Sequence, residues 1–471
     1  MKNTVPALVC LLLAACGGGG GGGSSTPATG TTPPTSPTTP TTPTSPTTPV
    51  GTSYKVAGLV VGLEASGLVV ANNTTDTVTL AKGATSFVFG TQVASGGAYS
   101  VTFPSQPGGF QSCSITGATS GTVSADVSLP VICTDAVVSV STLAGSDTAG
   151  FADGTGSAAR FGGDPALAVS GTRIAGMTLD AAGNIYVADS LNSRIRKITT
   201  AGVVTTFAGS GAFGSSNGTA ATATFSTPAA MVFDAAGNMF VTDTQAHNVR
   251  KIATDGTVTT FAGSGIYSSV DGTGIQASFR APSGIVIDAA GNLYVGDAEA
   301  HVIRKITAAG VVTTFAGTTN VAGSADGTGT SASFNDPAGL AIDAAGNLFV
   351  ADAKNNKIRK ITPAGVVTTY AGSGAAGKDD STTATAATFN VPVNLSIDSD
   401  GFLYVADTNS ARIRKISPSG KVTTVAGGGT GTDTANAGKD AAFVGPTSVV
   451  FDKSKTLYVA DGNKVRKLVR N

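Results

Sequence analysis

Side chains that could carry out acid–base or metal chemistry are rare in this sequence. Two histidines, His247 and His301, and two glutamates, Glu64 and Glu299, stand among its 471 residues. Glu299 lies two positions before His301, so this pair is a candidate for a chemical site. We favour ordinary variation in an exposed loop as the explanation of the pair, and no GxSxG segment with triad partners is evident. We therefore assign no catalytic residue, no metal site and no cofactor.

A larger set of carboxylates recurs at a regular interval. An aspartate ends each of six similar apolar segments, and an arginine follows seven residues later, or five residues later in the last copy. The pairs are Asp189 with Arg196, Asp243 with Arg250, Asp297 with Arg304, Asp352 with Arg359, Asp407 with Arg414, and Asp461 with Arg466. A ring of carboxylates could hold a metal ion, but an active site normally breaks symmetry. We interpret this set as structural, with loop capping and Asp–Arg pairing.

A second phrase, DGTG, occurs at residues 153–156, 271–274 and 326–329. Its oxygen ligands are too few for calcium, and a glycine turn explains it. A phenylalanine follows each DGTG phrase a few residues later, and the corresponding positions of the other three copies also have phenylalanine. The six residues are Phe161, Phe225, Phe279, Phe334, Phe389 and Phe443. We expect these rings to be plugs between neighbouring structural units.

Both sets belong to a repeat whose period is 54 or 55 residues, marked by Asp180, Asp234, Asp288, Asp343, Asp398 and Asp452. The copy at 284–317 divides into four short alternating segments joined by turns that contain glycine. Four strands at such a period predict a β-propeller, and six copies predict six blades. The last copy ends after its third strand, while residues 137–145 match the missing fourth strand. We expect residues 137–145 to complete the last blade and close the ring.

The repeat also resembles the NHL family in a YVAD-like segment followed by an IRKI-like segment. The first segments are 186–189, 240–243, 294–297, 349–352, 404–407 and 458–461, and the second are 195–198, 249–252, 303–306, 358–361, 413–416 and 465–468. The resemblance implies an NHL-type propeller over residues 137–471. The histidine that gives the family its name is kept only as His247 and His301, so a catalytic duty does not follow from it.

Composition supports an all-β fold and excludes one class of partner. Gly 63 and Pro 20 with only 12% charged residues are typical of short strands joined by many turns. Lys+Arg 29 balance Asp+Glu 29, so no electrostatic field gathers polyanions. We expect no nucleic-acid partner.

The first 51 residues predict a secretory signal followed by a tether. A lysine, an apolar run at 5–13 and the end Leu13-Ala14-Ala15-Cys16 are typical of a secretory signal, too short to span a bilayer. The end resembles the lipobox of bacterial lipoproteins, which implies cleavage after residue 15 and lipidation of Cys16. Gly17 at the next position favours the outer membrane, facing the periplasm or the cell surface. We expect the Gly-rich and Thr/Pro-rich residues 16–51 to form a disordered tether.

Residues 53–135 predict a small antiparallel β-sandwich, because seven alternating segments are separated by turn signals. Cys113 and Cys133 are the only cysteines in it, and in an exported protein they most simply form a disulfide. In layout this region resembles the immunoglobulin-like modules of bacterial lipoproteins.

Recognition is expected on one face of the propeller. The second connection of each blade and the crossings between blades fall at the same end of the sheets, which we call the loop-rich face, and loops on a rigid scaffold usually carry recognition. Residues that break the sixfold symmetry there are candidates for ligand binding: Asp164, Arg173, Asn192, Gln245, His247, Tyr267, Glu299, His301, Asn355 and Asn409.

Three classes of function remain open. The first is a binding scaffold for a protein, peptide or glycan, which we prefer because the long loops converge on one face. The second is a metal-dependent enzyme resembling propeller lyases or lactonases, and the third is a purely structural envelope component. Fold alone does not choose between the first and third.

The lipid anchor gives the first prediction. Cys16→Ser removes the thiol that is acylated, so the protein is expected to leave the membrane fraction, because one or more acyl chains supply its membrane affinity. Fractionation of cells checks this. Continued retention of the variant in membranes refutes lipidation at Cys16.

Overall fold

The computed structural model describes residues 51–162, 175–430 and 438–471, which form strands and short 3-10 helices. In these ranges no helix is long and apolar enough to cross a membrane. The described part is therefore all-β, as the sequence predicted.

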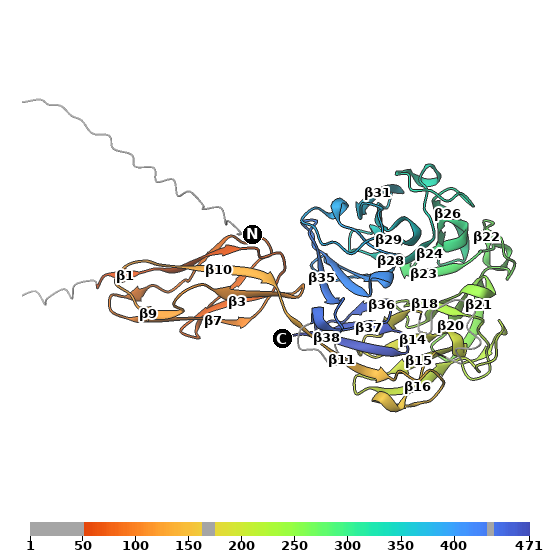
Figure 1. The fold of residues 1–471 in the computed structure, drawn as a ribbon, viewed down its shortest axis with the longest axis horizontal. Coiled ribbons are helices and arrows are strands. Elements are labelled where there is room, and N and C mark those ends of the chain that lie inside the picture. The colour runs from red at the N-terminus through yellow and green to blue at the C-terminus, as the bar shows by residue number, and fades with distance from the viewer. Residues whose placement is uncertain (1–50, 163–174, 431–437) are drawn as a thin grey trace, which may run out of the picture. The chain divides into compact units, whose positions relative to one another are not determined.

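Residues 53–135 form two packed four-stranded sheets, ordered β5-β2-β10-β8 and β4-β3-β7-β9, and a short β1-β6 pair (Figure 1). The strands are β1 (Ser53–Tyr54), β2 (Val56–Val61), β3 (Leu68–Asn72), β4 (Asp76–Leu80), β5 (Ser86–Val88), β6 (Val93–Ala94), β7 (Ala98–Ser105), β8 (Gln111–Ile115), β9 (Ser120–Thr122) and β10 (Val127–Asp135). Alternate side chains such as Val60 and Val131 on one sheet and Val70 and Val101 on the other share one buried core. This core follows from the period of two in each strand.

The expectation of a wholly antiparallel sandwich is wrong in one place. Strand β10 pairs with β2 in parallel and with β8 antiparallel. Alternation of apolar residues shows that a strand has a buried face but does not say which strand it pairs with, so the sequence could not reveal this parallel pair.

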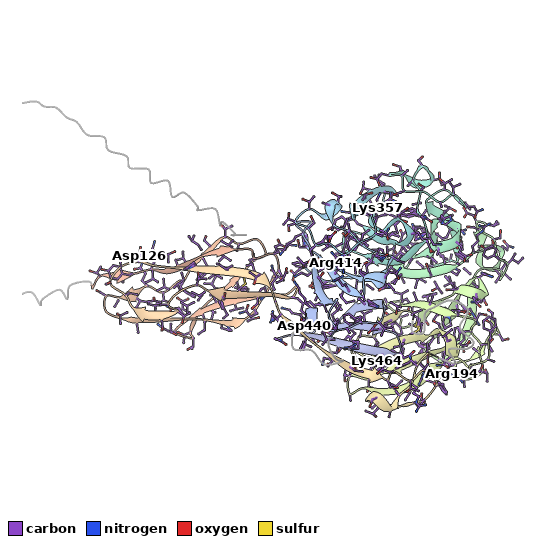
Figure 2. The ribbon with its side chains drawn as sticks, in the orientation of Figure 1. Asp126, Arg194, Lys357, Arg414, Asp440 and Lys464 are labelled. Atoms are coloured by element: carbon purple, nitrogen blue, oxygen red, sulfur yellow. A yellow bond between two sulfur atoms is a disulfide. The ribbon has the colours of Figure 1, made fainter. Side chains whose placement is uncertain are left out.

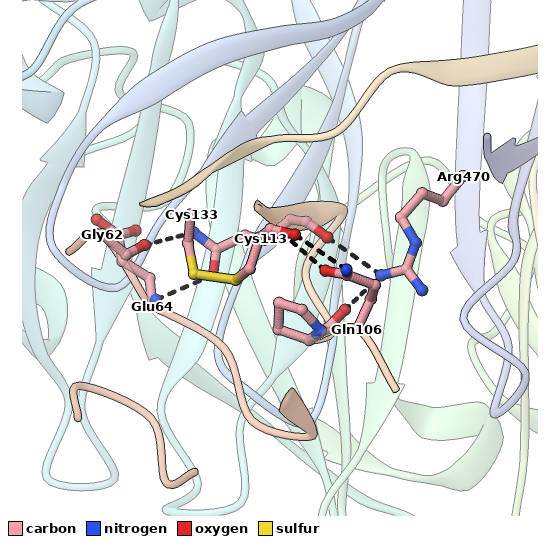
Figure 3. Close-up of a disulfide and its surroundings, with 8 residues drawn as sticks. Gly62, Glu64, Gln106, Cys113, Cys133 and Arg470 are labelled. Atoms are coloured by element: carbon pink, nitrogen blue, oxygen red, sulfur yellow. Dashed lines mark hydrogen bonds between the residues drawn. A yellow bond between two sulfur atoms is a disulfide. The ribbon is translucent and has the colours of Figure 1, made fainter. Parts of the chain in front are cut away.

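The disulfide between Cys113 and Cys133 is confirmed (Figure 3). The two cysteines lie directly opposite one another on β8 and β10, so the bond joins neighbouring strands of one sheet. An antibody domain instead has a disulfide between its two sheets. Beside the bond, Gln106 accepts the backbone N–H of Cys113 at 2.7 Å and donates to its carbonyl at 3.0 Å.

The repeat region forms six antiparallel sheets. Their first strands are β13 (Met177–Leu179), β18 (Pro228–Phe233), β23 (Pro282–Ile287), β28 (Pro337–Ile342), β32 (Pro392–Ile397) and β36 (Pro446–Phe451). The second strands are β14 (Ile185–Asp189), β19 (Met239–Asp243), β24 (Leu293–Asp297), β29 (Leu348–Asp352), β33 (Leu403–Asp407) and β37 (Leu457–Asp461). The third strands are β15 (Arg194–Ile198), β20 (Asn248–Ile252), β25 (Val302–Ile306), β30 (Lys357–Ile361), β34 (Arg412–Ile416) and β38 (Lys464–Arg470). The fourth strands are β16 (Val203–Ala208), β21 (Thr257–Ala262), β26 (Val311–Ala316), β31 (Val366–Ala371), β35 (Val422–Gly427) and, for the last sheet, β11 (Val138–Gly145).

These sheets surround a common centre as in a β-propeller (Figure 1). Each first strand contacts the first strand of the next sheet, and β13 of the first sheet contacts β36 of the last. Small residues permit this approach, because a Cβ added at Gly284 would lie 2.3 Å from the carbonyl oxygen of Ala338. The pairing of β11 with β38 confirms that the segment before the first repeat completes the last sheet.

Four of the sheets have a fifth strand that the sequence analysis missed. It consists of the Gly-Thr dipeptide within the DGTG phrase, or within the related NGTA at residues 217–220, and it pairs with the fourth strand. These strands are β12 (Gly154–Thr155), β17 (Gly218–Thr219), β22 (Gly272–Thr273) and β27 (Gly327–Thr328). Two residues are too few to produce a detectable alternation, so only the turn was evident.

The β-sandwich contacts the tight-turn ends of the last two sheets. The N–H of Ser66 donates to Oδ1 of Asp400 at 3.1 Å, in the turn between β32 and β33. The ring of Phe110 packs edge-on against Tyr404 and Phe451, with centroids 5.7 Å apart in both pairs. Both partners are next to tight turns, so the contact lies at the opposite end of these sheets from the long connections.

Closure by β11 gives the second prediction. Val140→Asp places a charge in the buried cluster shared with Leu468 of β38, and we expect the free energy of unfolding to fall by about 3 kcal/mol or more. Ser141→Asp, on the exposed face of the same strand, is the matched control and should change it by about 0.5 kcal/mol or less. Urea denaturation measures both. Equal stability of the two variants would contradict the closure.

Candidate functional site

The two ends of each sheet in the repeat region are built differently. At one end Asp288 accepts the backbone N–H groups of Ala290 and Asn292 at 2.9 and 2.8 Å, so the first connection is closed on itself. At the other end Asp297 accepts the N–H groups of Arg280 and Ala281 at 2.9 and 2.8 Å, from the crossing that enters the sheet. The crossing is therefore fastened to the second strand at the loop-rich face.

A buried arginine completes this fastening. Arg359 Nη1 lies 2.9 Å from Oδ2 of Asp352, and neither side chain is exposed. Its Nη2 lies 2.7 Å from Oδ1 of Asp326, the aspartate of the DGTG phrase. Arg359 also donates to the carbonyl oxygens of Ala325 and Ser333 in the same crossing. One guanidinium thus joins the second strand, the third strand and the crossing.

The arrangement recurs in every sheet, which confirms the structural interpretation of the Asp–Arg set. The other pairs are Asp189–Arg196 at 2.9 Å, Asp243–Arg250 at 3.8 Å, Asp297–Arg304 at 3.5 Å, Asp407–Arg414 at 3.0 Å and Asp461–Arg466 at 3.4 Å. Arg414 is labelled in Figure 2. The glycine turn alone does not explain DGTG, because Asp153 and Asp271 also pair with arginines, at 2.6 and 2.8 Å.

The phenylalanine plugs belong to the same unit. Phe161, Phe225, Phe279, Phe334 and Phe389 are fully buried, and each ring lies below the guanidinium of its sheet at 5.1 to 5.4 Å. Phe443 has the same relation to Arg466 at 5.4 Å. Cation–π attraction adds to the ion pair inside the core.

Burial raises the pKa values of these six aspartates, because the charged carboxylate loses its hydration. Burial raises the pKa of Asp243 to about 6, although hydrogen bonds from the backbone N–H groups of Thr227 and Ser226 act to lower this pKa. Arg250 lies 3.8 Å away and stabilises the charge less than a directly bonded guanidinium would.

The two histidines have structural partners. His247 and His301 follow short 3-10 helices, η4 (Thr244–Ala246) and η6 (Ala298–Ala300), and both have left-handed backbones with φ of 54° and 59°. Nδ1 of His247 lies 2.6 Å from the carbonyl oxygen of Arg280, and Nδ1 of His301 accepts the N–H of Asp336 at 3.2 Å. In the next sheet Asn356 has the same conformation and accepts the N–H of Val391 at 2.9 Å, so this position caps the following crossing.

Glu299 and His301 therefore do not act as the pair that their spacing suggested. Glu299 instead accepts the hydroxyl of Tyr267 at 2.6 Å, from a crossing 32 residues away. The hydrogen bond to Glu299 raises the pKa of Tyr267. The ring of Tyr267 is edge-on to His247 at 5.4 Å, and the guanidinium of Arg280 lies 5.1 Å from its centroid.

The structure thus brings together three of the candidate residues, Tyr267, Glu299 and His247, in what we call the Tyr267 cluster, and adds Arg280. The sequence analysis missed Arg280, although it stands directly after a plug phenylalanine where the other copies have Gly162, Ser226, Asn335, Asn390 and Val444. That break in symmetry was the available signal.

The remaining candidates are distributed elsewhere. Asn192 and Asn355 donate to the buried Asp189 and Asp352, both at 2.8 Å, so their amides belong to the scaffold. Gln245 and Asn409 are exposed on second connections. Asp164, Arg173 and the lipidation candidate Cys16 lie outside the described residues.

The pocket at the mouth of the central channel is lined mainly by small residues such as Gly176, Ala230 and Gly339, with Ser283, Asn394 and Thr447 as its polar side chains. This lining can form hydrogen bonds but supplies neither a general acid nor a general base. Among the described residues, no group of three or more His, Cys, Asp or Glu side chains is placed to hold a metal ion.

Comparison with known proteins identifies the repeat and the fold. Residues 334–361 match the NHL repeat. The chain is 32% identical over 267 residues to human NHL repeat-containing protein 2, covering 49% of this chain and 37% of that protein. It is 30% identical over 285 residues to the Arabidopsis thaliana chloroplastic protein SUPPRESSOR OF QUENCHING 1, covering 57% of this chain and 26% of that protein. The chain thus spans about a quarter to just over a third of the length of these curated relatives.

Two solved structures share the fold over most of the chain. One is a Bacteroides thetaiotaomicron protein of unknown function, with 17% identity, a TM-score of 0.54, and coverage of 91% of this chain and 99% of that one. The other is an auxiliary nutrient binding protein from Bacteroides ovatus, with 15% identity, a TM-score of 0.53, and coverage of 91% and 100%. At these identities the likeness shows the fold alone.

The third prediction concerns Asp243. Its pKa rises from 3.8 in the unfolded chain to about 6 in the folded chain, so the folded protein holds the proton more tightly between these values. The stabilisation from this proton is full below the unfolded pKa and is lost as the pH rises through 6. Relative to Asp243→Asn, the parent protein should gain about 2 kcal/mol of unfolding free energy between pH 7 and 4.5. Urea denaturation across this range, with the carboxyl carbon of Asp243 followed by NMR, measures it. A midpoint near 4 and parallel pH profiles would contradict the assignment.

Proposed function

We propose that this protein is an envelope-anchored lipoprotein whose propeller binds a protein, peptide or glycan outside the cytoplasm through its loop-rich face. The proposal includes a six-bladed propeller of NHL type at 137–471, an immunoglobulin-like module at 53–135, and a lipidated tether at 16–51 that follows a signal peptide at 1–15. The outer membrane, facing the periplasm or the cell surface, is the proposed location.

The Tyr267 cluster on a fixed scaffold is the observation that carries the proposal. The crossings of the loop-rich face are fastened by buried Asp–Arg pairs, so their exposed side chains are held in one arrangement before a ligand arrives. Preorganisation of this kind lowers the entropic cost of binding. Tyrosine and arginine are also the side chains most enriched at binding hot spots.

Two further observations support this reading. The β-sandwich contacts the tight-turn ends of the sheets at Asp400 and Phe451, so the loop-rich face lies at the other end from these contacts. A structural neighbour bears the name auxiliary nutrient binding protein, which is a binding function on the same fold.

Blocking one face at a time tests the proposal. Gln245→Cys places a thiol on the loop-rich face, and Ala289→Cys places one on an exposed tight turn of the opposite face. Each full-length variant is coupled to a large polyethylene glycol maleimide and screened against peptidoglycan sacculi, soluble polysaccharides and a random peptide library. The parent chain treated in the same way is the reference.

We expect binding to fall at least tenfold when the polymer is attached at residue 245, because it covers the loop-rich face. Attachment at residue 289 should leave binding within about twofold of the reference. Binding that is lost only with the polymer at 289, or that survives both modifications, refutes recognition by the loop-rich face.

A further inference from the structure

Every exposed aromatic side chain of the described residues lies in three consecutive crossings of the propeller. Phe151 is 46% exposed, Phe213 67% and Tyr267 50%. We call these three residues the aromatic arc. At the position of Phe213, which bridges to its plug Phe225, the fourth and fifth crossings have Ala322 and Ala376. The arc thus occupies one side of the loop-rich face.

Arg194 connects the crossings that carry the first two members of the arc. The guanidinium of Arg194, which is labelled in Figure 2, lies 4.0 Å from the centroid of Phe151. Its Nη2 donates at 2.7 Å to the carbonyl oxygen of Ser210, in the crossing that carries Phe213. Arg194 therefore packs on the ring of Phe151 and bonds the crossing that carries Phe213.

Tyr267, the third member of the arc, is connected to the crossing of Phe213 through the second sheet. Asn248 donates at 2.8 Å to Oγ of Ser215, so the crossing with Phe213 is tied to the second sheet. His247 precedes Asn248 and packs against Tyr267 at 5.4 Å. Glu299 and Arg280 then supply a carboxylate and a guanidinium next to the Tyr267 ring. The arc is a set of exposed rings on consecutive crossings, with Arg194 beside Phe151 and with Glu299 and Arg280 beside Tyr267.

We propose that the aromatic arc binds a neutral oligosaccharide chain, with a sugar ring packed on each aromatic ring. This inference rests on the proposed function and names its ligand class. The C–H groups on one face of a pyranose carry partial positive charge, and the face of an aromatic ring is negative, so the two attract while apolar area is buried. Hydroxyl groups at the edge of the sugar both donate and accept, which matches Glu299 as acceptor and Arg194 and Arg280 as donors.

The form of the surface favours a chain over the other ligand classes. A small apolar molecule requires a concave pocket that covers most of its surface, and a protein partner places its anchors in desolvated pockets. The rings of the arc instead stand exposed on separate crossings. A polymer that repeats the same unit along its length can contact all three rings at once, which raises its avidity through effective concentration.

Charge favours a neutral chain. Basic and acidic residues of the sequence are equal in number, so no overall field attracts a polyanion. At Tyr267 the carboxylate of Glu299 and the guanidinium of Arg280 both lie beside the ring, so their charges offset one another.

The test uses the full-length protein and a panel of cellulose, chitin, amylose, dextran and peptidoglycan sacculi, with retention in affinity gels as the readout. Tyr267→Ala and Phe213→Ala each remove a ring and should weaken retention at least tenfold. Lys378→Ala is the matched control, because Lys378 is exposed in the crossing between β31 and β32, which is three sheets away from the crossing that carries Phe213. It should leave retention within twofold.

Tyr267→Trp supplies a second readout. The chain contains no tryptophan, so the introduced indole would be its only one, and it retains an aromatic face for stacking. We expect its emission to shift on adding a bound polysaccharide and to stay constant in the presence of a polysaccharide that the gels do not retain. Tyr267→Phe loses only the hydroxyl that donates to Glu299 and keeps the ring, so it should bind the polysaccharide more tightly than Tyr267→Ala.

Each outcome decides the matter. Retention of no panel member, or retention that Tyr267→Ala and Phe213→Ala leave unchanged, overturns the inference. If the chain binds peptides through the face blocked at residue 245 and retains no polysaccharide, the glycan assignment is wrong while the proposed function stands. If binding of any kind is insensitive to that block, both are wrong.

Discussion

The buried aspartate–arginine pair is the interaction on which the rest of the propeller depends. Taking both charges out of water is expensive, and the cost is offset only because each carboxylate also accepts backbone N–H groups and each guanidinium also bonds carbonyl oxygens of the crossing. Arg359, for example, bonds Asp352, Asp326 and two carbonyl groups with neither it nor Asp352 exposed to solvent. Removing one partner of such a pair would leave a buried charge, which typically costs about 3 to 5 kcal/mol.

This constraint separates the scaffold from the surface that we propose for ligand binding. The Asp–Arg pair and the plug phenylalanine fasten each crossing, and in three places a side chain after a 3-10 helix, His247, His301 or Asn356, caps the next crossing. The exposed positions of the crossings are therefore free to vary without loss of the fold. Phe213, Tyr267 and Ala376 occupy similar places on crossings that have the same supports. Asymmetry of the exposed side chains on a symmetric frame is what makes one side of the loop-rich face suitable for a ligand.

The sequence predicted the features that recur with the period of 54 or 55 residues, and also the single disulfide. The period, the closing segment at 137–145, the Asp–Arg pairing and the disulfide between Cys113 and Cys133 all follow from residue type and spacing, and the structure confirms them. Features that depend on which segments meet in space were missed. The parallel pairing of β10 with β2, the bond from Tyr267 to Glu299, and the second carboxylate on four of the arginines join residues that are 32 or more positions apart, and no local pattern marks them. His247 and His301, candidates for ligand binding, also bond the following crossing through Nδ1, a role that their spacing does not reveal.

The most direct test of this account is amide hydrogen exchange at the crossing residues whose backbone N–H groups donate to the buried aspartates. The N–H groups of Ala281, Asn335 and Asn390 bond Asp297, Asp352 and Asp407 at 2.7 to 2.8 Å. If the pairs hold the loop-rich face rigid, these amides should be protected as strongly as those of the adjoining second strands, and Arg359→Met should release Asn335 while leaving Ala281 protected. Exchange at the rate of an unstructured peptide in the parent protein would show that the crossings open freely, and it would contradict a preorganised binding face.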